Sequence, residues 1–568
     1  MKNIKLFSML PKVFEQLGKL FNKSYIKLGA VLALITLIGL STVNHHGISV
    51  DEDIHLLILK WNWEFIQEGK PVPKDLGFYG VVFDGVAEIV FQVKHWIETN
   101  LFSRPPLEPY LSALDSEILV LDRFLTKHVF TFCVSLITYL SVAGGITLLY
   151  GKKWAWLAPL MLALFPRFWG HSFFNPKDIP FAALFSLCVY LGAYIVEEIK
   201  QNSSSPFFLG IRRTTIRAIG YGILVGLLSG IRIGGFLMLG FVGLVSLILI
   251  PRNNIGRFLK FSLFNYTLMT VSWAIALFCV IPSSWSNPFR WFWDTINYLS
   301  QHEWPGSVLF KGEWIKGSEL PWDYLPTWFL ITTPSLFLFY FLLGLIGLTR
   351  NYHQFSDRQK AYILLVILQI FLLPMIAIIK SSNIYDGLRH FLFVIPGMAI
   401  VTTIGFIWSY QQISQPRFKL WLVGVTLLGV LIILFDMVTL HPYEYIYFNR
   451  VFGGLKAAYQ QYETDYWALS MRKGMEWINQ NGKKGAILVV PAAWNLYSAK
   501  PFAEPDFTIV DRSQLEKITL EQPDYYLFFS RFKYQEHFPN CDLVYFITRK
   551  GVPLTTVKDC TANTDESY

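Results

Sequence analysis

Apolar residues fall into blocks of about 20 along most of the chain, and short polar segments separate them. A helix rises about 1.5 Å per residue, so such a block matches a hydrocarbon layer about 30 Å thick. The pattern predicts a polytopic α-helical membrane protein with about eleven transmembrane helices. The expected spans are residues 25–43, 127–149, 154–168, 179–197, 217–231, 234–250, 261–282, 326–348, 361–379, 390–409 and 420–438.

The two ends of the chain have patterns of their own. Residues 1–24 place apolar side chains at helical spacing with lysines between them, which predicts a basic amphipathic helix on the membrane surface. No convincing cleavage site follows the first span, so we expect an uncleaved anchor. The segment 439–568 contains short β-type runs, which predict a small α/β domain: residues 486–490, 506–510, 524–529 and 543–549.

Basic residues indicate which loops are cytoplasmic. Every second connection carries lysine or arginine, and such loops lie inside by the positive-inside rule. With an odd number of spans, the N-terminus is then cytoplasmic, while the first large loop (44–126) and the α/β domain after the membrane domain (25–438) are extracytoplasmic. The basic residues are Lys152 and Lys153; Lys200, Arg212, Arg213 and Arg217; Arg252, Arg257 and Lys260; Arg350, Arg358 and Lys360; Arg417 and Lys419.

Composition excludes other classes. Hydrophobic residues make up 53% and charged residues only 16%, against about 25% charged in soluble proteins, so a cytosolic enzyme is ruled out. The net charge of +9 is spread over short loops, and no nucleic-acid partner is expected. Cys541 and Cys560 could pair in the outer domain, but two cysteines fix no pattern and the pairing stays open.

The first outer loop opens with three consecutive acids, Asp51, Glu52 and Asp53, followed by His55. Adjacent carboxylates at a bilayer surface raise one another's pKa unless a cation or a hydrogen-bond donor compensates. One interpretation is a solvated cap on an interfacial helix, with Asp51 as N-cap. The other is a catalytic or cation-binding role.

The second outer loop is a tight connection that contains His171, Asn175, Lys177 and Asp178. The simple interpretation is a turn at Asn175, with Asp178 capping the next helix. Near a phosphate-bearing lipid, however, Lys177 would be a point-charge partner, and Asp178 would orient or bind a hard cation.

Further polar residues recur at the same expected depth. Arg232 falls between two apolar segments, and Arg389 and His390 follow Tyr385 at the start of the tenth span. Arginines here could be membrane anchors, or they could grip a phosphate through two hydrogen bonds. The aromatic and acidic segment 441–467, with Glu444 and Asp465, could be either a docking seam or part of a site.

The order of these features resembles the GT-C membrane glycosyltransferases, specifically the polyprenyl- or dolichyl-phosphate-sugar enzymes related to protein O-mannosyltransferases and aminoarabinose transferases. The match spreads over residues 25–470. Its parts are Asp51, Glu52 and His55 in a DExxH arrangement, HSFFNPKDIP (171–180), an arginine near the fifth and sixth spans, LPWDYLP (320–326), GLRHFLF (387–393), HPYEYIYFN (441–449) and YETDYW (462–467).

The resemblance implies a GT-C-like fold and inverting sugar transfer from a lipid-linked phosphate donor on the outer face of a bacterial inner membrane. The acceptor would be an envelope lipid, glycan or protein. Asp51 would be the general base, with Glu52 and Asp178 orienting the acceptor, and Asp51 and Asp178 could hold a divalent cation such as Mg2+ or Mn2+. Lys177, Arg232, Arg389 and His390 would bind the donor phosphate. Further candidates are His55, His171, Asn175, Tyr385, Glu444 and Asp465.

The rival interpretation is a multi-span transporter or a lipid-sugar flippase. Transporters usually carry charged groups near the bilayer midplane and show repeats between their halves. Here the interiors of the expected spans are nearly free of charge, and no repeat is evident. These features favour the transferase.

Overall fold

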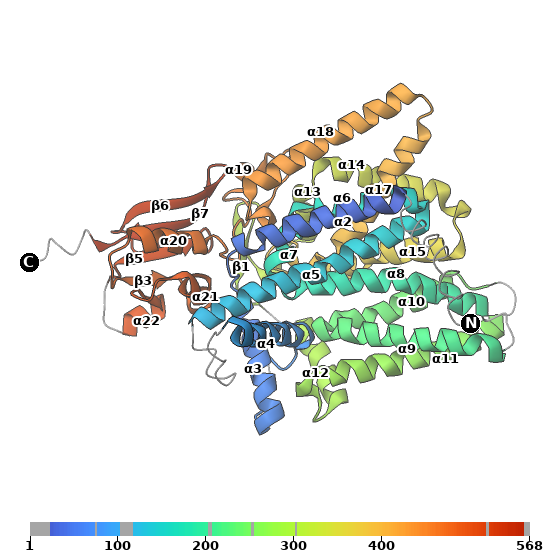
Figure 1. Cartoon of the computed structure of the whole chain (residues 1–568), viewed down its shortest axis with the longest axis horizontal. Coiled ribbons are helices and arrows are strands. Elements are labelled where there is room, and N and C mark those ends of the chain that lie inside the picture. The colour runs from blue at the N-terminus through green and yellow to red at the C-terminus, as the bar shows by residue number, and fades with distance from the viewer. Residues whose placement is uncertain are drawn as a thin grey trace, which may run out of the picture.

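Long helices form a bundle that carries a sheet domain at one end (Figure 1), as seen in a computed structural model of the chain. The structure describes residues 23–73, 76–102, 117–202, 207–251, 255–301, 304–517 and 522–561. The expected basic helix lies, except for its last two residues, outside these ranges.

Nine helices in the described ranges are long and apolar enough to cross a membrane. This confirms a polytopic α-helical membrane protein. They are α2 (Lys23–Thr42), α5 (Glu117–Tyr150), α8 (Asp178–Asn202), α9 (Phe207–Ile231), α11 (Ile255–Cys279), α14 (Ser335–Asn351), the continuous unit of α15 (Asp357–Ile367), η7 (Leu368–Leu372) and α16 (Leu373–Ile379), α17 (Val394–Gln412), and α18 (Pro416–Leu440).

Two of the expected spans are shorter in the structure. Residues 154–168 form α6 (Leu157–Ala163) and the start of α7 (Pro166–Phe174), and the backbone is extended at Phe165. Proline disfavours helical geometry in the residue before it, which explains the break. The other is the 16-residue unit of η3 (Ile233–Phe236) and α10 (Leu237–Ile248). The count of eleven spans therefore stays a prediction.

A proline also divides the expected span 326–348. The chain is helical in α13 (Tyr324–Thr332), extended at Thr333, and helical again from Ser335. Pro334 explains this break in the same way, because the residue before it is pushed out of the helical region. The spanning part α14 thus begins later than its apolar pattern predicts.

The expected outer loops contain regular structure at the bundle end nearest the sheet domain (Figure 1). The first loop forms α3 (Glu52–Glu68) and α4 (Val82–Phe102). Apolar side chains on α4 such as Ile89, Trp96 and Leu101 are exposed, as expected of a helix at a lipid boundary. The loop after α11 forms α12 (Pro288–Gln301) and an antiparallel hairpin of β1 (Ser307–Phe310) and β2 (Glu313–Lys316).

Helix α8 shows that acidic and basic loops lie at opposite ends of the bundle. It begins at Asp178, in the predicted outer loop, and Lys200 lies in its last turn. Lys200 pairs with Asp357 at 2.8 Å, and Arg358 pairs with Glu197. Two of the connections predicted to be cytoplasmic therefore meet at the end away from Asp178.

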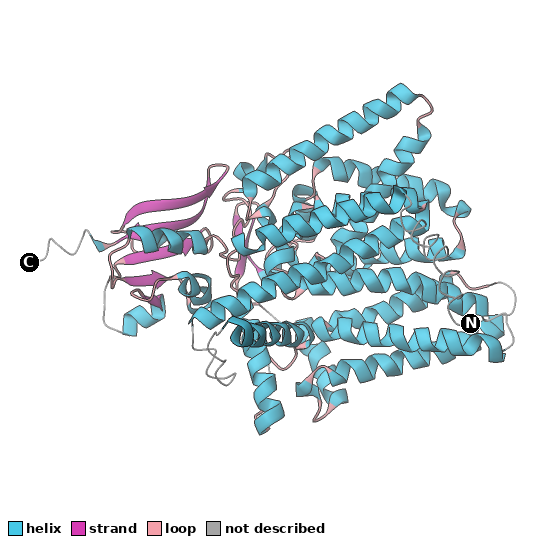
Figure 2. Ribbon diagram, viewed as in Figure 1, coloured by secondary structure: helices cyan, strands magenta, loops and turns pink. Residues whose placement is uncertain are grey.

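The C-terminal domain is a five-stranded mixed sheet (Figure 2). The strand order is β4-β3-β5-β7-β6, with the first three parallel and the last two pairings antiparallel. The four predicted runs correspond to β3 (Ile487–Val490), β4 (Thr508–Asp511), β5 (Tyr525–Phe529) and β6 (Asp542–Arg549), while β7 (Val552–Asp559) was not predicted. The helices after α18 are α19 (Gly454–Ala458), α20 (Met471–Asn481), α21 (Leu496–Ala499) and α22 (Arg512–Lys517).

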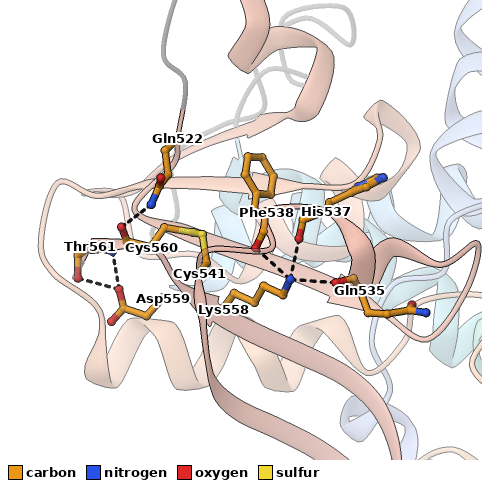
Figure 3. Close-up of a disulfide and its surroundings, with 9 residues drawn as sticks. All are labelled: Gln522, Gln535, His537, Phe538, Cys541, Lys558, Asp559, Cys560 and Thr561. Carbon is orange, nitrogen blue, oxygen red and sulfur yellow. Dashed lines mark hydrogen bonds between the residues drawn. A yellow bond between two sulfur atoms is a disulfide. The ribbon is translucent and has the colours of Figure 1, made fainter. Parts of the chain in front are cut away.

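Cys541 and Cys560 form a disulfide, which settles the pairing that the sequence leaves open (Figure 3). Their Cα atoms are 4.4 Å apart, at the start of β6 and just after β7. The ammonium of Lys558 holds the adjacent loop by donating hydrogen bonds to the carbonyls of Gln535, His537 and Phe538. The bridge thus closes the outer edge of the sheet.

Candidate active site

Asp51 lies at the start of α3 and pairs with a distant arginine. Its carboxylate accepts a hydrogen bond from Nη1 of Arg389, and its side chain remains 37% exposed. Asp51 occupies the N-cap position of α3, as one interpretation expects, but its side chain makes no capping hydrogen bond. Burial raises the pKa of Asp51, but the positive charges of Arg389 and His55 outweigh this effect and hold the pKa below its usual value. At neutral pH Asp51 is an ionised carboxylate that remains reachable.

Glu52 points into the protein instead. One carboxylate oxygen accepts from the amide and the hydroxyl of Ser49 at 2.8 and 3.0 Å, and the other lies 2.9 Å from Nε2 of His128. Glu52 is fully buried. Its hydrogen bonds hold the turn that carries Asp51.

The third acid has a different environment. Burial, together with the charges of Asp51 and Glu52, raises the pKa of Asp53 to about 7. Its Oδ1 accepts from the amide of Ile54 at 2.7 Å. The three consecutive acids thus have three different environments, and Asp51 is the one that faces the outer-loop cations.

The second loop fixes Asp178 through Asn175. The amide oxygen of Asn175 accepts from the backbone of Asp178 at 2.8 Å, and its Nδ2 donates to Oδ2 of Asp178 at 3.0 Å. Asn175, rather than Asp178, therefore satisfies the start of α8. The Asp178 carboxylate is free to pair with Arg232, at the break between α9 and η3.

Lys177 lies among these charges. Its Nζ is 3.7 Å from the centre of the Tyr79 ring. Burial lowers the pKa of Lys177 to about 7, and the charges of Arg232 and Arg389 contribute to this shift. Lys177 is therefore a cation whose protonation depends on what binds beside it.

Arg389 contacts several other residues of the site. It lies in the short helix η8 (Arg389–Phe391) before α17, with its Nε 3.0 Å from Oδ2 of Asp386. Its guanidinium also packs over the rings of Tyr385 and Trp467, at 4.7 and 5.1 Å. A guanidinium held on several sides is well oriented for an anion.

His390 is neutral beside Arg389. Its ring meets the edge of Tyr385, with centroids 4.7 Å apart. Burial lowers the pKa of His390 well below its usual value, and the charges of Arg389, Arg232 and Lys177 lower it further. His390 can therefore contribute hydrogen bonds but not charge.

Five residues predicted from four separate sequence segments meet here. We call them the central charge cluster. The charges of the other four all act on Lys177, which places the set in one electrostatic neighbourhood. Three cations face two carboxylates, so the cluster is formally positive and suited to an anion. Its members are Asp51, Lys177, Asp178, Arg232 and Arg389.

The remaining histidine candidates lie around the cluster. His171, in α7, accepts from Nδ2 of Asn175 at 3.2 Å and contacts the Tyr466 hydroxyl at 2.9 Å, so it supports the second loop from behind. His55 lies 3.2 Å from Asp84, in α4. Both are buried.

Other candidates belong to the seam between the bundle and the sheet domain. Asp465 accepts from the hydroxyls of Tyr445 and Ser470. Oε1 of Glu444 lies 2.7 Å from Nδ1 of His441. These contacts fit the docking interpretation of the segment 441–467. Tyr385 stacks on Trp304 at 4.5 Å and forms part of the aromatic wall.

Sequence reasoning missed the support of Arg389 from the C-terminal domain. Arg531, just after β5, donates to Oδ1 of Asp386 at 2.5 Å and pairs with Glu463 at 3.0 Å. Burial raises the pKa of Glu463 to about 7. Asp386 stands three residues before Arg389, a weak local signal, but nothing in the sequence around Arg531 reveals the contact.

The expected cation ligands do not favour a metal. The Asp51 carboxylate is paired with Arg389, while the two oxygens of Asp178 are taken by Arg232 and Asn175. Guanidinium groups thus occupy the places where a shared cation would bind. A divalent cation at Asp51 and Asp178 stays a prediction.

Comparison with known proteins gives likenesses of fold. No protein-family model matches the chain, and no curated protein matches it significantly. Among solved structures, it resembles the oligosaccharyltransferase AglB of Archaeoglobus fulgidus in complex with an inhibitory peptide and a dolichol-phosphate, at 11% identity and a TM-score of 0.46 over 90% of this chain and 70% of that one. It also resembles ArnT of Cupriavidus metallidurans bound to undecaprenyl phosphate, at 13% identity and a TM-score of 0.40 over 85% and 98%. At such identities only the fold is shared, and the lipid phosphates are properties of those two proteins.

Proposed function

We propose that this protein is an inverting glycosyltransferase that moves a sugar from a polyprenyl-phosphate donor to an acceptor at the outer membrane surface. The observation that carries the proposal is the central charge cluster, where the ionised, partly exposed Asp51 adjoins Lys177, Arg232 and Arg389. A base beside an anion site at a lipid boundary matches this reaction.

The cations act on the leaving group. A lipid-linked sugar phosphate is a diester with one negative charge, and the departing lipid phosphate carries up to two. Lys177, Arg232 and Arg389 therefore stabilise the transition state more than the bound donor. Because the pKa of Lys177 is near 7 before an anion arrives, donor binding would draw a proton onto its amine.

Asp51 acts on the acceptor. The acceptor oxygen or nitrogen attacks the anomeric carbon, its proton passes to the Asp51 carboxylate, and the bond from the anomeric carbon to the phosphate oxygen breaks. The products are the glycosylated acceptor and the polyprenyl phosphate. One displacement with attack opposite the leaving group inverts the configuration. Arg389 contacts Asp51 and would also bind the donor phosphate, so it holds the base next to the leaving group.

The arrangement of the two ends of the helix bundle supports a reaction on the outer face of the membrane. The cluster lies at the end of α8 opposite the paired basic connections. The disulfide Cys541–Cys560 suits an oxidising compartment. Both observations agree with the orientation that the positive-inside rule predicts.

The test uses the full chain in vesicles with a radiolabelled polyprenyl-phosphate sugar and membranes as the acceptor source. Wild type should release unglycosylated polyprenyl phosphate and place label on an acceptor, both identified by mass. A flippase would move the lipid between leaflets and leave its mass unchanged. That second result would refute the transferase.

A further inference from the structure

A second polar cluster joins the first span to the last, away from the proposed chemistry. His46 follows η1 (Val43–His45) at the end of α2, while His441 and Glu444 follow α18. Nδ1 of His441 lies 2.7 Å from Oε1 of Glu444, and Nε2 of His46 lies 3.9 Å from Oε2. One ligand atom from each of the three residues lies within 4.8 Å of the others.

The cluster contains buried polar atoms that are unsatisfied. His46 is fully buried and Glu444 is 2% exposed. Among the described residues, Nε2 of His46 and Oε2 of Glu444 find no hydrogen-bond partner. Leaving such atoms unpaired costs about 1–3 kcal/mol each, so a missing ligand between them is the economical explanation.

The orientation of His46 is that of a metal ligand. Its Nδ1 lies 3.2 Å from the carbonyl oxygen of Val43, a contact that fixes the tautomer and leaves the Nε2 lone pair facing Glu444. Histidines that bind metals usually donate their other nitrogen to a carbonyl or carboxylate in this way.

We propose that His46, His441 and Glu444 bind one divalent transition-metal cation, with two imidazole nitrogens and one carboxylate oxygen as ligands. This donor set suits Zn2+ and its neighbours rather than Mg2+. Ligand atoms about 2.0–2.2 Å from a tetrahedral zinc stand about 3.3–3.6 Å apart. The three ligand atoms here lie within 4.8 Å of one another, so small side-chain movements would bring them around one ion. His45, whose Nδ1 is 2.8 Å from Nε2 of His441, adjoins the exposed side.

The cation would link the ends of the first and last spans at a place where the C-terminal domain also makes contact. Arg549, at the end of β6, donates twice to the carbonyl of His441, at 3.1 and 2.8 Å. Arg472, in α20, donates to the carbonyl of His46 at 3.0 Å. The three proposed ligands therefore stand where two spans and the C-terminal domain meet, and the proposal does not depend on sugar transfer.

Another group of possible ligands already contains a cation. His95, Glu98 and Asp122 also come within 4.8 Å of one another. The ammonium of Lys94 already contacts Asp122 at 2.7 Å and Glu98 at 3.3 Å, and so supplies the positive charge. This second group provides the control.

The experiment measures zinc on the purified full-length protein in detergent after chelator treatment and titration with Zn2+. We expect one zinc per chain and a rise in Tm on binding. Glu444→Gln and His46→Gln should each weaken zinc affinity by at least about tenfold, the lower end of what a disturbed metal site loses. His353→Gln, at an exposed histidine in η6 (Tyr352–Gln354), should leave it unchanged.

Two outcomes would overturn the proposal. One is wild-type affinity in both ligand variants, and the other is loss of zinc in His95→Gln. If the ligand variants do not fold, Co2+ bound to the wild type gives a readout that needs no mutation. Four-coordinate cobalt with nitrogen and oxygen ligands has intense visible absorption bands, and spectra of hydrated cobalt alone would equally refute the site.

Discussion

Arg531 of the C-terminal domain donates a 2.5 Å hydrogen bond to Asp386 of the membrane bundle. The other oxygen of Asp386 lies 3.0 Å from Arg389, so a residue of the sheet domain supports the arginine that holds the proposed base. All three side chains are buried. The sheet domain is therefore part of the site's construction rather than an appendage.

The first prediction concerns the contacts that run from Arg531 through Asp386 to Arg389. Arg531→Ala leaves Asp386 with one cationic partner instead of two in a buried place, and breaking such a pair costs about 3–5 kcal/mol. We expect a lower Tm and a higher KM for the donor, since Arg389 loses its fixed orientation. Arg512→Ala, on the partly exposed α22, is the control and should change neither quantity. An unchanged KM in a folded Arg531→Ala protein would contradict the idea that Arg531 orients Arg389 through Asp386.

The second prediction separates the adjacent acids. Asp51→Asn removes the proposed base and should lower kcat by about 10²–10⁴-fold while the protein stays folded. Asp53→Asn should stay near wild type, because the Asp53 carboxylate bonds its own backbone segment. Transfer rates and Tm values of both variants provide the measurement, and a fully active Asp51→Asn protein would remove Asp51 from the reaction.

The third prediction is a pH dependence of donor binding. The pKa of Lys177 is lowered to about 7, so its amine is charged below that pH and neutral above it. Donor KM should therefore rise as pH increases through about 7. Lys177→Arg should flatten the profile, because a guanidinium stays charged.

Two other groups have a pKa raised to about 7, Glu463 and Asp53, and a control addresses Asp53, which lies beside the proposed base. The Asp53→Asn variant should keep the wild-type profile of KM against pH. If the profile disappears in Asp53→Asn and survives in Lys177→Arg, Lys177 is not its source.

The fourth prediction tests orientation. Trp322, just before α13, is 74% exposed, and His353, after α14, is exposed at the opposite end of that helix pair. In a chain with Cys133 and Cys279 replaced by serine, Trp322→Cys should react with an impermeant thiol reagent on intact cells. His353→Cys should react only after permeabilisation, and the reverse pattern would invert the proposed topology.

The fifth prediction concerns the disulfide. Cys541 and Cys560 are separated by 19 positions, and closing a loop of that size stabilises a domain by about 3 kcal/mol in the chain-entropy treatment. The double variant Cys541→Ser with Cys560→Ser should unfold its sheet domain at lower denaturant concentration. Reductant should shift the wild type in the same direction and leave the variant unaffected.

Much of the fold follows from the sequence because lipid imposes a simple rule on helix length and polarity. That rule fails where local chemistry interrupts an apolar block. Pro166 and Pro334 break helices inside stretches that remain hydrophobic, because each proline pushes the residue before it out of the helical region, and a hydropathy average does not register this effect. Strand β7 was missed for a related reason, since Pro553 and Lys558 weaken its β pattern.

The site was predictable where its residues carry chemistry at the ends of spans. Asp51, Lys177, Asp178, Arg232 and Arg389 stand out because charge beside an apolar block is expensive. Glu52 stands out equally, yet its carboxylate turns inward to Ser49 and His128. Direction of a side chain depends on tertiary packing, and so does the contact of Arg531, which crosses 145 positions to reach Asp386.

Helix α8 has 25 residues and is therefore a stiff rod about 37 Å long. Its far end is pinned by the pairs of Lys200 with Asp357 and Glu197 with Arg358. Asp178 is the first residue of the same rod. A movement of those distant ion pairs along the helix axis, on the opposite side of the bilayer, would therefore shift Asp178 and its pairing with Arg232 by a similar amount.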